Sequence, residues 1–118
     1  MATFTKTLLS GSTNGKAILV AATASPGTTI HTAVAGTSSL DEIWLYAVNS
    51  SGVDVKLTIQ WGEETAPNGN IEVFIPGESG LIPVIPGLLL QNSLVVRAFA
   101  DTANVICIHG YVNQILWR

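Results

Sequence analysis

The sequence is short of charge, and this shortage narrows its possible partners. Only 11% of the residues are charged, compared with about 25% in an average soluble domain. The 5 lysine and arginine residues are spread along the chain. No cluster among them could follow a nucleic-acid backbone, so we expect no nucleic-acid partner. So few charges indicate that much of the protein surface is covered by neighbouring molecules in an assembly.

Cysteine and histidine are also scarce. Cys107 is the single cysteine, which excludes an intramolecular disulfide and a metal site built from several thiolates. It lies in the apolar run 105–108, and we expect a small buried core residue there. His31 and His109 are far apart and show no known metal-ligand spacing. We expect His31 on the solvated face of a strand, and we predict neither a metal site nor a cofactor.

Catalytic motifs are missing as well. Asp41 and Glu42 are adjacent, and adjacent residues on a strand point to opposite faces, so they are poorly placed to act as a pair. Glu63 and Glu64 fall in a predicted loop that lacks the oxygen spacing of a calcium site. The sequence contains no glycine-rich phosphate loop and no Gly-x-Ser-x-Gly elbow. We therefore predict that the protein is not an enzyme and has no small-molecule substrate.

Long apolar segments and helix patterns are absent from the sequence. No apolar run approaches the ~20 residues of a membrane-spanning helix. No window repeats apolar residues at helical spacing without interruption by glycine, proline or β-branched residues. Residues 1–9 lack the apolar stretch of a signal peptide. We expect no membrane partner, and synthesis and folding in a cytoplasm.

What the sequence does contain is a succession of short strand patterns. Apolar or alternating runs are separated by Gly, Pro, Asn and Ser clusters, which is typical of a sandwich or barrel. The predicted strands cover residues 15–22, 28–35, 41–49, 53–61, 71–75, 93–100 and 105–115. We predict one all-β domain over residues 13–118, an antiparallel β-sandwich of Greek-key or jelly-roll type with eight or nine short strands. Residues 1–12, rich in Thr, Ser and Gly, are predicted to form an extended N-terminal arm.

Three local patterns refine this expectation. Residues 53–61 alternate between apolar and polar side chains, which predicts a strand that is buried on one side and wet on the other. The Asn-Ser-Ser-Gly sequence at 49–52 predicts a hairpin turn. Residues 76–87 contain three prolines, which predicts an edge strand with turns rather than a central strand.

Aromatic residues supply the candidate binding surface. Trp44 and Tyr46 share one face of the predicted strand 41–49, and apolar residues occupy the other face. This strand is therefore either central or covered by a partner. A sugar-stacking platform formed with Trp61 is the alternative, although Trp61 shares a face with predicted core residues. Trp117 lies where little local core is available, so we expect it to anchor an interface.

Several strand and turn segments resemble known proteins. Glu-Ile-Trp-Leu-Tyr-Ala-Val-Asn at 42–49 and Leu-Thr-Ile-Gln-Trp-Gly at 57–62 resemble segments of small structural proteins of tailed bacteriophages. The same is true of Ile-Pro-Val-Ile-Pro-Gly-Leu at 82–88 and of the runs at 95–100 and 104–113. The resemblance covers most of the chain, residues 42–115, and is carried by strand and turn patterns. It implies a virion protein, most similar to a capsid decoration (cement) protein.

The resemblance also implies partners and a location. Decoration proteins bind the outer face of the shell of major capsid protein, stabilise it against internal DNA pressure and usually act as small oligomers. It therefore implies the major capsid protein as the partner, a homo-oligomer (dimer or trimer), and a place on the virion surface after synthesis in the host cytoplasm. Two alternatives stay open: another virion component (a neck, tail or fibre-associated protein) and a carbohydrate-binding β-sandwich module.

The interface is expected to combine the arm with the exposed aromatic residues. An extended arm can add a strand to the exposed edge of a neighbour's sheet, where backbone hydrogen bonds supply the affinity. The expected interface residues are Ala2, Thr3, Phe4, Lys6, Leu8, Leu9, Trp44, Tyr46 and Trp117.

Overall fold

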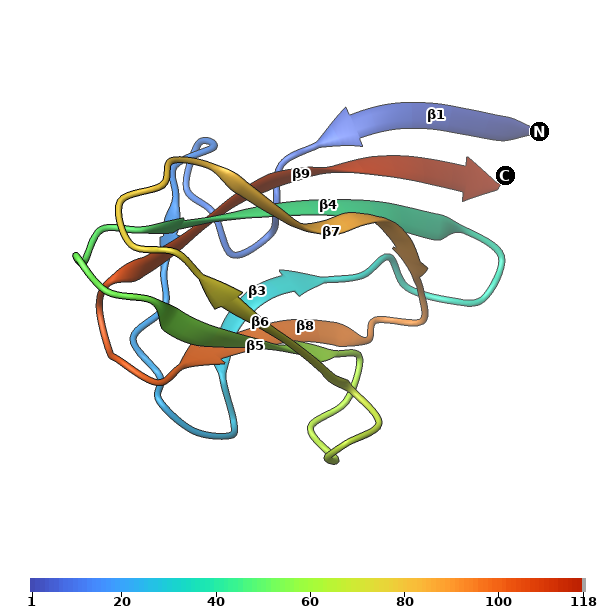
Figure 1. The fold of residues 1–118 in the computed structure, drawn as a ribbon. Coiled ribbons are helices and arrows are strands. Elements are labelled where there is room, and N and C mark those ends of the chain that lie inside the picture. The colour runs from blue at the N-terminus through green and yellow to red at the C-terminus, as the bar shows by residue number, and fades with distance from the viewer. Residues whose placement is uncertain (118) are drawn as a thin grey trace.

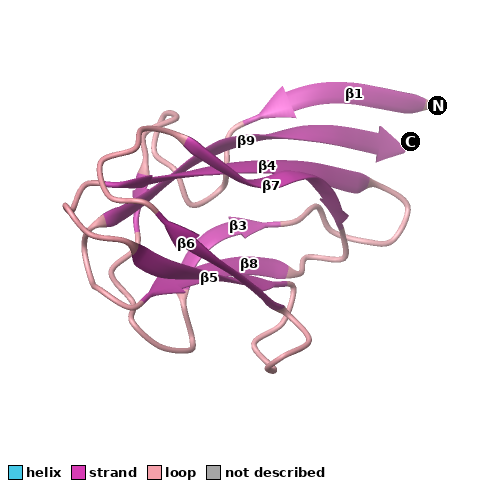
Figure 2. Cartoon of the chain, viewed as in Figure 1, coloured by secondary structure: helices cyan, strands magenta, loops and turns pink. Residues whose placement is uncertain are grey.

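The computed structural model describes residues 1–117, which form two layers of antiparallel β-sheet with no helix among them (Figures 1 and 2). One layer, sheet A, contains the strands β1 (Ala2–Thr7), β2 (Ile18–Leu19), β4 (Leu40–Asn49), β7 (Ile82–Leu90) and β9 (Ile106–Trp117). The other layer, sheet B, contains β3 (Thr28–Thr32), β5 (Val55–Trp61), β6 (Asn70–Ile75) and β8 (Val95–Ala100). The predicted all-β architecture of antiparallel sheets is confirmed.

The strand order places β4 and β9 in the middle of sheet A. Its order is β1-β9-β4-β7, and β2 also pairs with β9. Sheet B has the order β3-β8-β5-β6. The strand from the proline-rich segment, β7, lies at the edge of sheet A, and its register against β4 shifts twice near Pro83 and Pro86. The expectation of an edge strand is therefore confirmed. The physical reason is that proline has no N–H to donate to a second neighbouring strand.

The core lies between the two sheets and is built from alternating side chains. In β4 every second residue, beginning with Asp41, is buried, and the intervening residues face outward. The fully buried side chains include Ile43 and Leu45 from sheet A and Leu57 and Ile59 from sheet B. This period of two is what one buried face of a strand requires.

The outer side of β5 in sheet B is less exposed to solvent than the alternation of residues 53–61 predicted. Thr58 and Gln60 are both 1% exposed. The loop before β3 folds over this face, where the Gln60 side chain accepts a hydrogen bond from Gly27 N (2.8 Å) and donates one to Ser25 Oγ (3.0 Å). Gln60 is therefore buried because a loop distant in sequence covers it.

The turn at 49–52 connects the two sheets instead of closing a hairpin. It leads from β4 in sheet A to β5 in sheet B. The Asn49 amide is buried at this corner and donates to Val53 O (2.8 Å) and Ile75 O (2.9 Å). β5 instead pairs with the strand that follows it in the sequence, β6, so the loop at 62–69 closes a hairpin. The prediction of a hairpin at 49–52 is wrong.

The N-terminal segment predicted as an arm forms strand β1 within sheet A. Residues Ala2–Thr7 pair with β9 in continuous register, from Ala2 opposite Trp117 to Thr7 opposite Val112. Figure 1 shows β1 and the end of β9 side by side, with the start of β1 and the end of β9 at the same end of the sandwich. Among the described strands, β9 is the main packing partner of β1. The arm is thus an edge strand of its own chain in this structure.

Candidate functional site

The outer face of sheet A gathers most of the aromatic side chains of the chain. Directly opposed residues on neighbouring strands share a face. In the register of sheet A, Trp44 lies opposite Tyr111, Tyr46 opposite His109, and Ala2 opposite Trp117. We call this surface the aromatic face and define it by Phe4, Lys6, Glu42, Trp44, Tyr46, Tyr111, Asn113 and Trp117. It combines residues from β1, β4 and β9.

The centre of the aromatic face is a stacked pair of rings. The Trp44 and Tyr111 ring centroids are 6.1 Å apart and the ring planes differ by 11°. The Lys6 ammonium lies 4.9 Å from the centroid of the Tyr111 ring, which is a cation–π distance. The Trp44 ring lies against the backbone of Gly87, where an added Cβ would be 2.8 Å from Trp44 Cζ2. Glycine at this position therefore makes room for the ring.

Glu42 fixes the polar part of this face. Its Oε1 accepts hydrogen bonds from Trp44 Nε1 (2.7 Å) and from Asn113 Nδ2 (2.9 Å). The hydrogen bond from Asn113, followed by that from Trp44, lowers the pKa of Glu42 below the ordinary glutamate value. Burial against the sheet and the adjacent Tyr111 raise the pKa of Tyr46, so the phenol keeps its proton at neutral pH. The face thus presents one carboxylate and one ammonium among neutral groups.

A shallow depression lies on the β1 side of this face. It has a volume of about 470 Å³ and is lined by Phe4, Thr5, Lys6, Glu42, Asn113, Gln114 and Ile115. The Phe4 ring is 75% exposed and Trp117 is 56% exposed. These two exposed aromatic residues lie on the same face as the stacked rings, and apolar side chains gathered on one surface are typical of binding sites.

The structure brings together six of the nine residues expected at the interface. Ala2, Phe4, Lys6, Trp44, Tyr46 and Trp117 all lie on the outer side of sheet A. Thr3 is on the opposite side of the same ribbon, and Leu8 is 54% exposed just after β1. Leu9 is 2% exposed and belongs to the core. It therefore has no surface to offer a partner.

Three members of the aromatic face were not among the interface residues expected from the sequence. Tyr111, Glu42 and Asn113 become members through the pairing of β4 with β9. The alternation within 105–115 places Tyr111 and Asn113 on one face of their strand. The register that sets them beside Trp44 and Glu42 joins segments about 70 residues apart, which no local pattern reveals.

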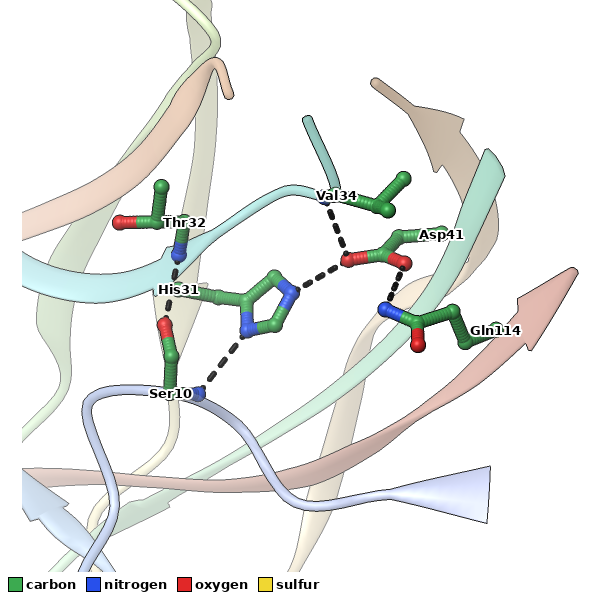
Figure 3. A network of polar contacts seen from close by, with 6 residues as sticks. All are labelled: Ser10, His31, Thr32, Val34, Asp41 and Gln114. Atoms are coloured by element: carbon green, nitrogen blue, oxygen red, sulfur yellow. Dashed lines mark hydrogen bonds and ion pairs between the residues drawn. The ribbon is translucent and has the colours of Figure 1, made fainter. Parts of the chain in front are cut away.

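A buried polar network around His31 and Asp41 is the second arrangement of side chains that could carry out chemistry (Figure 3). His31 is 4% exposed, so the expectation that it faces solvent is wrong. Its Nε2 lies 2.7 Å from Asp41 Oδ2, and its Nδ1 accepts a hydrogen bond from the Ser10 backbone N (2.9 Å). Because Nδ1 is an acceptor, the proton of the neutral ring is assigned to Nε2, which donates to Asp41.

The remaining bonds of this network give it a structural role. Asp41 also accepts from Val34 N (3.1 Å) and from Gln114 Nε2 (2.9 Å), and Ser10 Oγ accepts from Thr32 N (2.7 Å). The Ser10 hydroxyl is therefore engaged with the Thr32 backbone, whereas a nucleophile would be bonded to the histidine. The network joins β3, β4, β9 and the segment after β1 through the interior (Figure 3). It fixes the two layers relative to each other.

Cys107 departs from its expected place. It is half-buried, and it pairs with Val48 and Leu19 in sheet A. The buried residues on either side of it in β9 are Ile106 and Ile108, so Cys107 points outward. Within residues 1–117 no group of three or more His, Cys, Asp or Glu side chains converges as a metal site. The described residues also form no apolar helix of membrane-spanning length.

Comparison with known proteins gives no match for this chain, whether against family models, curated proteins or solved structures.

Proposed function

We propose that this chain is a non-catalytic structural protein of a tailed-phage particle, acting as a capsid decoration (cement) protein. In this role it binds the outer face of the shell of major capsid protein and stabilises the shell against internal DNA pressure. The observation that carries the proposal is the aromatic face, a broad sheet surface with exposed Phe4 and Trp117 beside the stacked rings of Trp44 and Tyr111. The resemblance of residues 42–115 to phage structural proteins adds to it.

The chemistry of the face suits a protein partner. Trp and Tyr dominate the binding energy of protein interfaces because they combine a large apolar area with a polar tip. The face carries few charges, so little charge would have to be desolvated on docking. A protein that binds the assembled shell and not the separated subunits stabilises the assembled state by mass action. Many copies on one shell add up without demanding a large interface from each.

The fold proposed with this function is a jelly roll made of β2–β9. The order β2-β9-β4-β7 in one layer and β3-β8-β5-β6 in the other supports it, because consecutive strands alternate between the layers except at the β5–β6 hairpin. Double-sheet jelly rolls of eight strands occur in viral capsid proteins and in lectins. In this proposal β1 is an addition at the edge of the roll. A protein of the neck, tail or fibre could have the same fold. Locating the protein on virus particles by electron microscopy distinguishes these roles from capsid decoration.

The test is co-sedimentation of the purified protein with assembled shells. Trp117→Ala and Tyr46→Ala should each weaken binding by about 10-fold, since aromatic anchors carry most of the affinity. Phe74→Ala is the matched control, because Phe74 is 65% exposed on β6 of the other sheet. Loaded shells should also withstand higher temperature than bare shells. Binding that is absent, or that is lost in Phe74→Ala and kept in the two face variants, would overturn the proposal.

A carbohydrate-binding module is the second candidate, and one observation favours it. The nearly parallel rings of Trp44 and Tyr111 lie beside Glu42 and Asn113, which offer a carboxylate and an amide at the edge of the stack. Sugar rings stack their apolar faces on aromatic side chains while their hydroxyls bond to such groups. A glycan array probed with the protein and with Trp44→Ala tests this candidate. A glycan bound by the first and lost by the second supports it, and an array without hits removes it.

A further inference from the structure

The four outer edges of the two sheets differ in how they are protected from pairing. Exposed strand edges invite another strand, and proteins protect them with proline, bulges or charge. On β7 the protection comes from Pro83 and Pro86 and two register shifts. On β3 it comes from a register shift between Thr29 and His31. On β6 the exposed carboxylate of Glu72 sits in the middle of the strand.

Strand β1 lacks the proline and the register shifts that protect β7 and β3. Its 6 residues contain no proline and pair with β9 without a register shift. Its one charged side chain is Lys6, and the ammonium of Lys6 is held over the Tyr111 ring of its own sheet. The outer edge of β1 is therefore a regular strand edge of three Thr, Ala, Phe and Lys, and its one charge is directed over its own sheet.

We propose that β1 pairs with the β1 strand of a second copy of this chain, antiparallel and centred on Phe4. Such a contact is isologous, because each copy presents the same residues to the other across a two-fold axis. The two five-stranded sheets would then join into one continuous sheet, with the backbone groups of both β1 edges satisfied. This inference concerns self-association alone and goes beyond the proposed function, which it does not require.

The side chains of β1 select this register. With Phe4 opposite Phe4 of the second copy, Thr3 lies opposite Thr5, and Ala2 lies opposite Lys6. Aromatic pairs and Thr–Thr pairs are favourable when directly opposed in antiparallel strands. The two Lys6 side chains fall at opposite ends of the paired segment, so no like charges face each other. The charge pattern of β1 therefore allows β1 of a second copy to pair with it without charge repulsion.

The register also fixes how the two copies are oriented. Directly opposed residues project to the same side of a sheet. Phe4 belongs to the aromatic face of each copy, so both aromatic faces would lie on the same side of the joined sheet. The dimer would present two aromatic faces, with the paired Phe4 rings between them.

The first test is the oligomeric state of the pure protein in the absence of any shell, measured by sedimentation equilibrium. We expect a concentration-dependent dimer. Phe4→Lys should weaken it by about 100-fold or more, because it places two lysines opposite each other on the two-fold axis. Phe4 is 75% exposed, so the monomer fold tolerates this change. The matched control is Phe74→Lys on the β6 edge, where the side chain is 65% exposed, and the dimer should be unaffected.

The second test fixes the register by crosslinking in a Cys107→Ser background. Phe4→Cys should give a disulfide-linked dimer under mild oxidation, because the two Cβ atoms face each other across the axis. Thr7→Cys should give none, because the two residues would be about 20 Å apart along the paired strands. A monomer at all concentrations, a trimer, loss of the dimer in Phe74→Lys but not in Phe4→Lys, or crosslinking at Thr7 instead of Phe4 would overturn the inference. Shell binding is measured separately with Trp117→Ala, so failure of one proposal is distinguishable from failure of the other.

Discussion

Trp44 and Tyr111 are directly opposed on the two central strands of sheet A, with ring centroids 6.1 Å apart and planes within 11° of parallel. The Trp44 ring also lies against Gly87 of β7, and the Lys6 ammonium from β1 lies over the Tyr111 ring. Because three strands and a glycine hold the rings in place, the centre of the aromatic face is formed before any partner arrives. A preformed aromatic surface binds with less loss of side-chain entropy.

The stacked pair should be measurable as a coupling energy. In a double-mutant cycle of Trp44→Leu and Tyr111→Leu, we expect a coupling of about 0.5–1.5 kcal/mol in the free energy of unfolding, the range found for aromatic pairs. Chemical denaturation of the four proteins supplies the numbers. The control cycle combines Trp44→Leu with Phe74→Leu on the other sheet, and its effects should add. Additivity in the Trp44–Tyr111 cycle would contradict the interpretation of the rings as an interacting pair.

Gly87 should tolerate a side chain poorly because of the Trp44 ring. Gly87 has φ +82°, and its added Cβ would be 2.8 Å from the ring, whereas Gly80 has φ +76° and open space around it. Both alanine variants suffer the backbone strain of positive φ, so their difference isolates the clash. We expect Gly87→Ala to lower the free energy of unfolding by about 1–3 kcal/mol more than Gly80→Ala does.

A second variant tests the cause of that difference. In a Trp44→Leu background the ring is gone, and Gly87→Ala and Gly80→Ala should then destabilise by similar amounts. An excess cost at Gly87 that persists without the ring would show that something other than Trp44 requires glycine there.

The elements that the sequence predicted well are those whose pattern is local. Strand β4 was expected at 41–49 and is found at Leu40–Asn49, with Ile43 and Leu45 inside and Trp44 and Tyr46 outside. The edge position of β7 followed from Pro83 and Pro86, because a missing backbone N–H is a property of the residue itself. The opposite orientation of Asp41 and Glu42 followed from the strand period and is observed.

The features that the sequence did not predict depend on distant segments. The turn residues at 49–52 bend the chain, but they do not specify whether the next strand joins the same sheet or the opposite one. Gln60 is buried because the loop around Gly27 covers it, and His31 is buried because Ser10 and Asp41 enclose it. Tyr111 joins Trp44 only through the register of β4 and β9. In each case the burial of a residue is decided by a partner that local alternation does not identify.

Asp41 should be one of the polar residues most important for stability. It is fully buried and accepts hydrogen bonds from Val34 N, from Gln114 Nε2 and from the His31 ring. Asp41→Ala would leave these donors without an acceptor in the interior. We expect the free energy of unfolding to fall by about 3–5 kcal/mol.

Asp54→Ala is the matched control for this change. Asp54 is exposed before β5, and its removal should alter the free energy of unfolding by no more than about 0.5 kcal/mol. Chemical denaturation measures both variants. Equal effects of the two substitutions would show that the buried network does not hold the layers together.

Part of the loss of folding stability at acidic pH should come from the protonation of Glu42. Hydrogen bonds from Asn113 and Trp44 lower the pKa of this carboxyl in the folded protein relative to the unfolded chain. A depressed folded pKa contributes stability that is fully present above the unfolded pKa and is lost as the pH falls through the folded pKa. Carbon-detected NMR titration of the Glu42 carboxyl should therefore show a pKa below the ordinary glutamate value.

Removing the first of these donors should move that titration. In Asn113→Leu the pKa of Glu42 should rise towards its ordinary value, and the part of the acid-dependent stability that depends on Glu42 should shrink. Asn68→Leu makes the same chemical change in the exposed loop between β5 and β6 and should leave the Glu42 titration in place. A Glu42 curve that is the same in Asn113→Leu as in the unchanged protein would mean that the amide does not stabilise the carboxylate. The polar edge of the aromatic face would then have to be assigned to the indole of Trp44 alone.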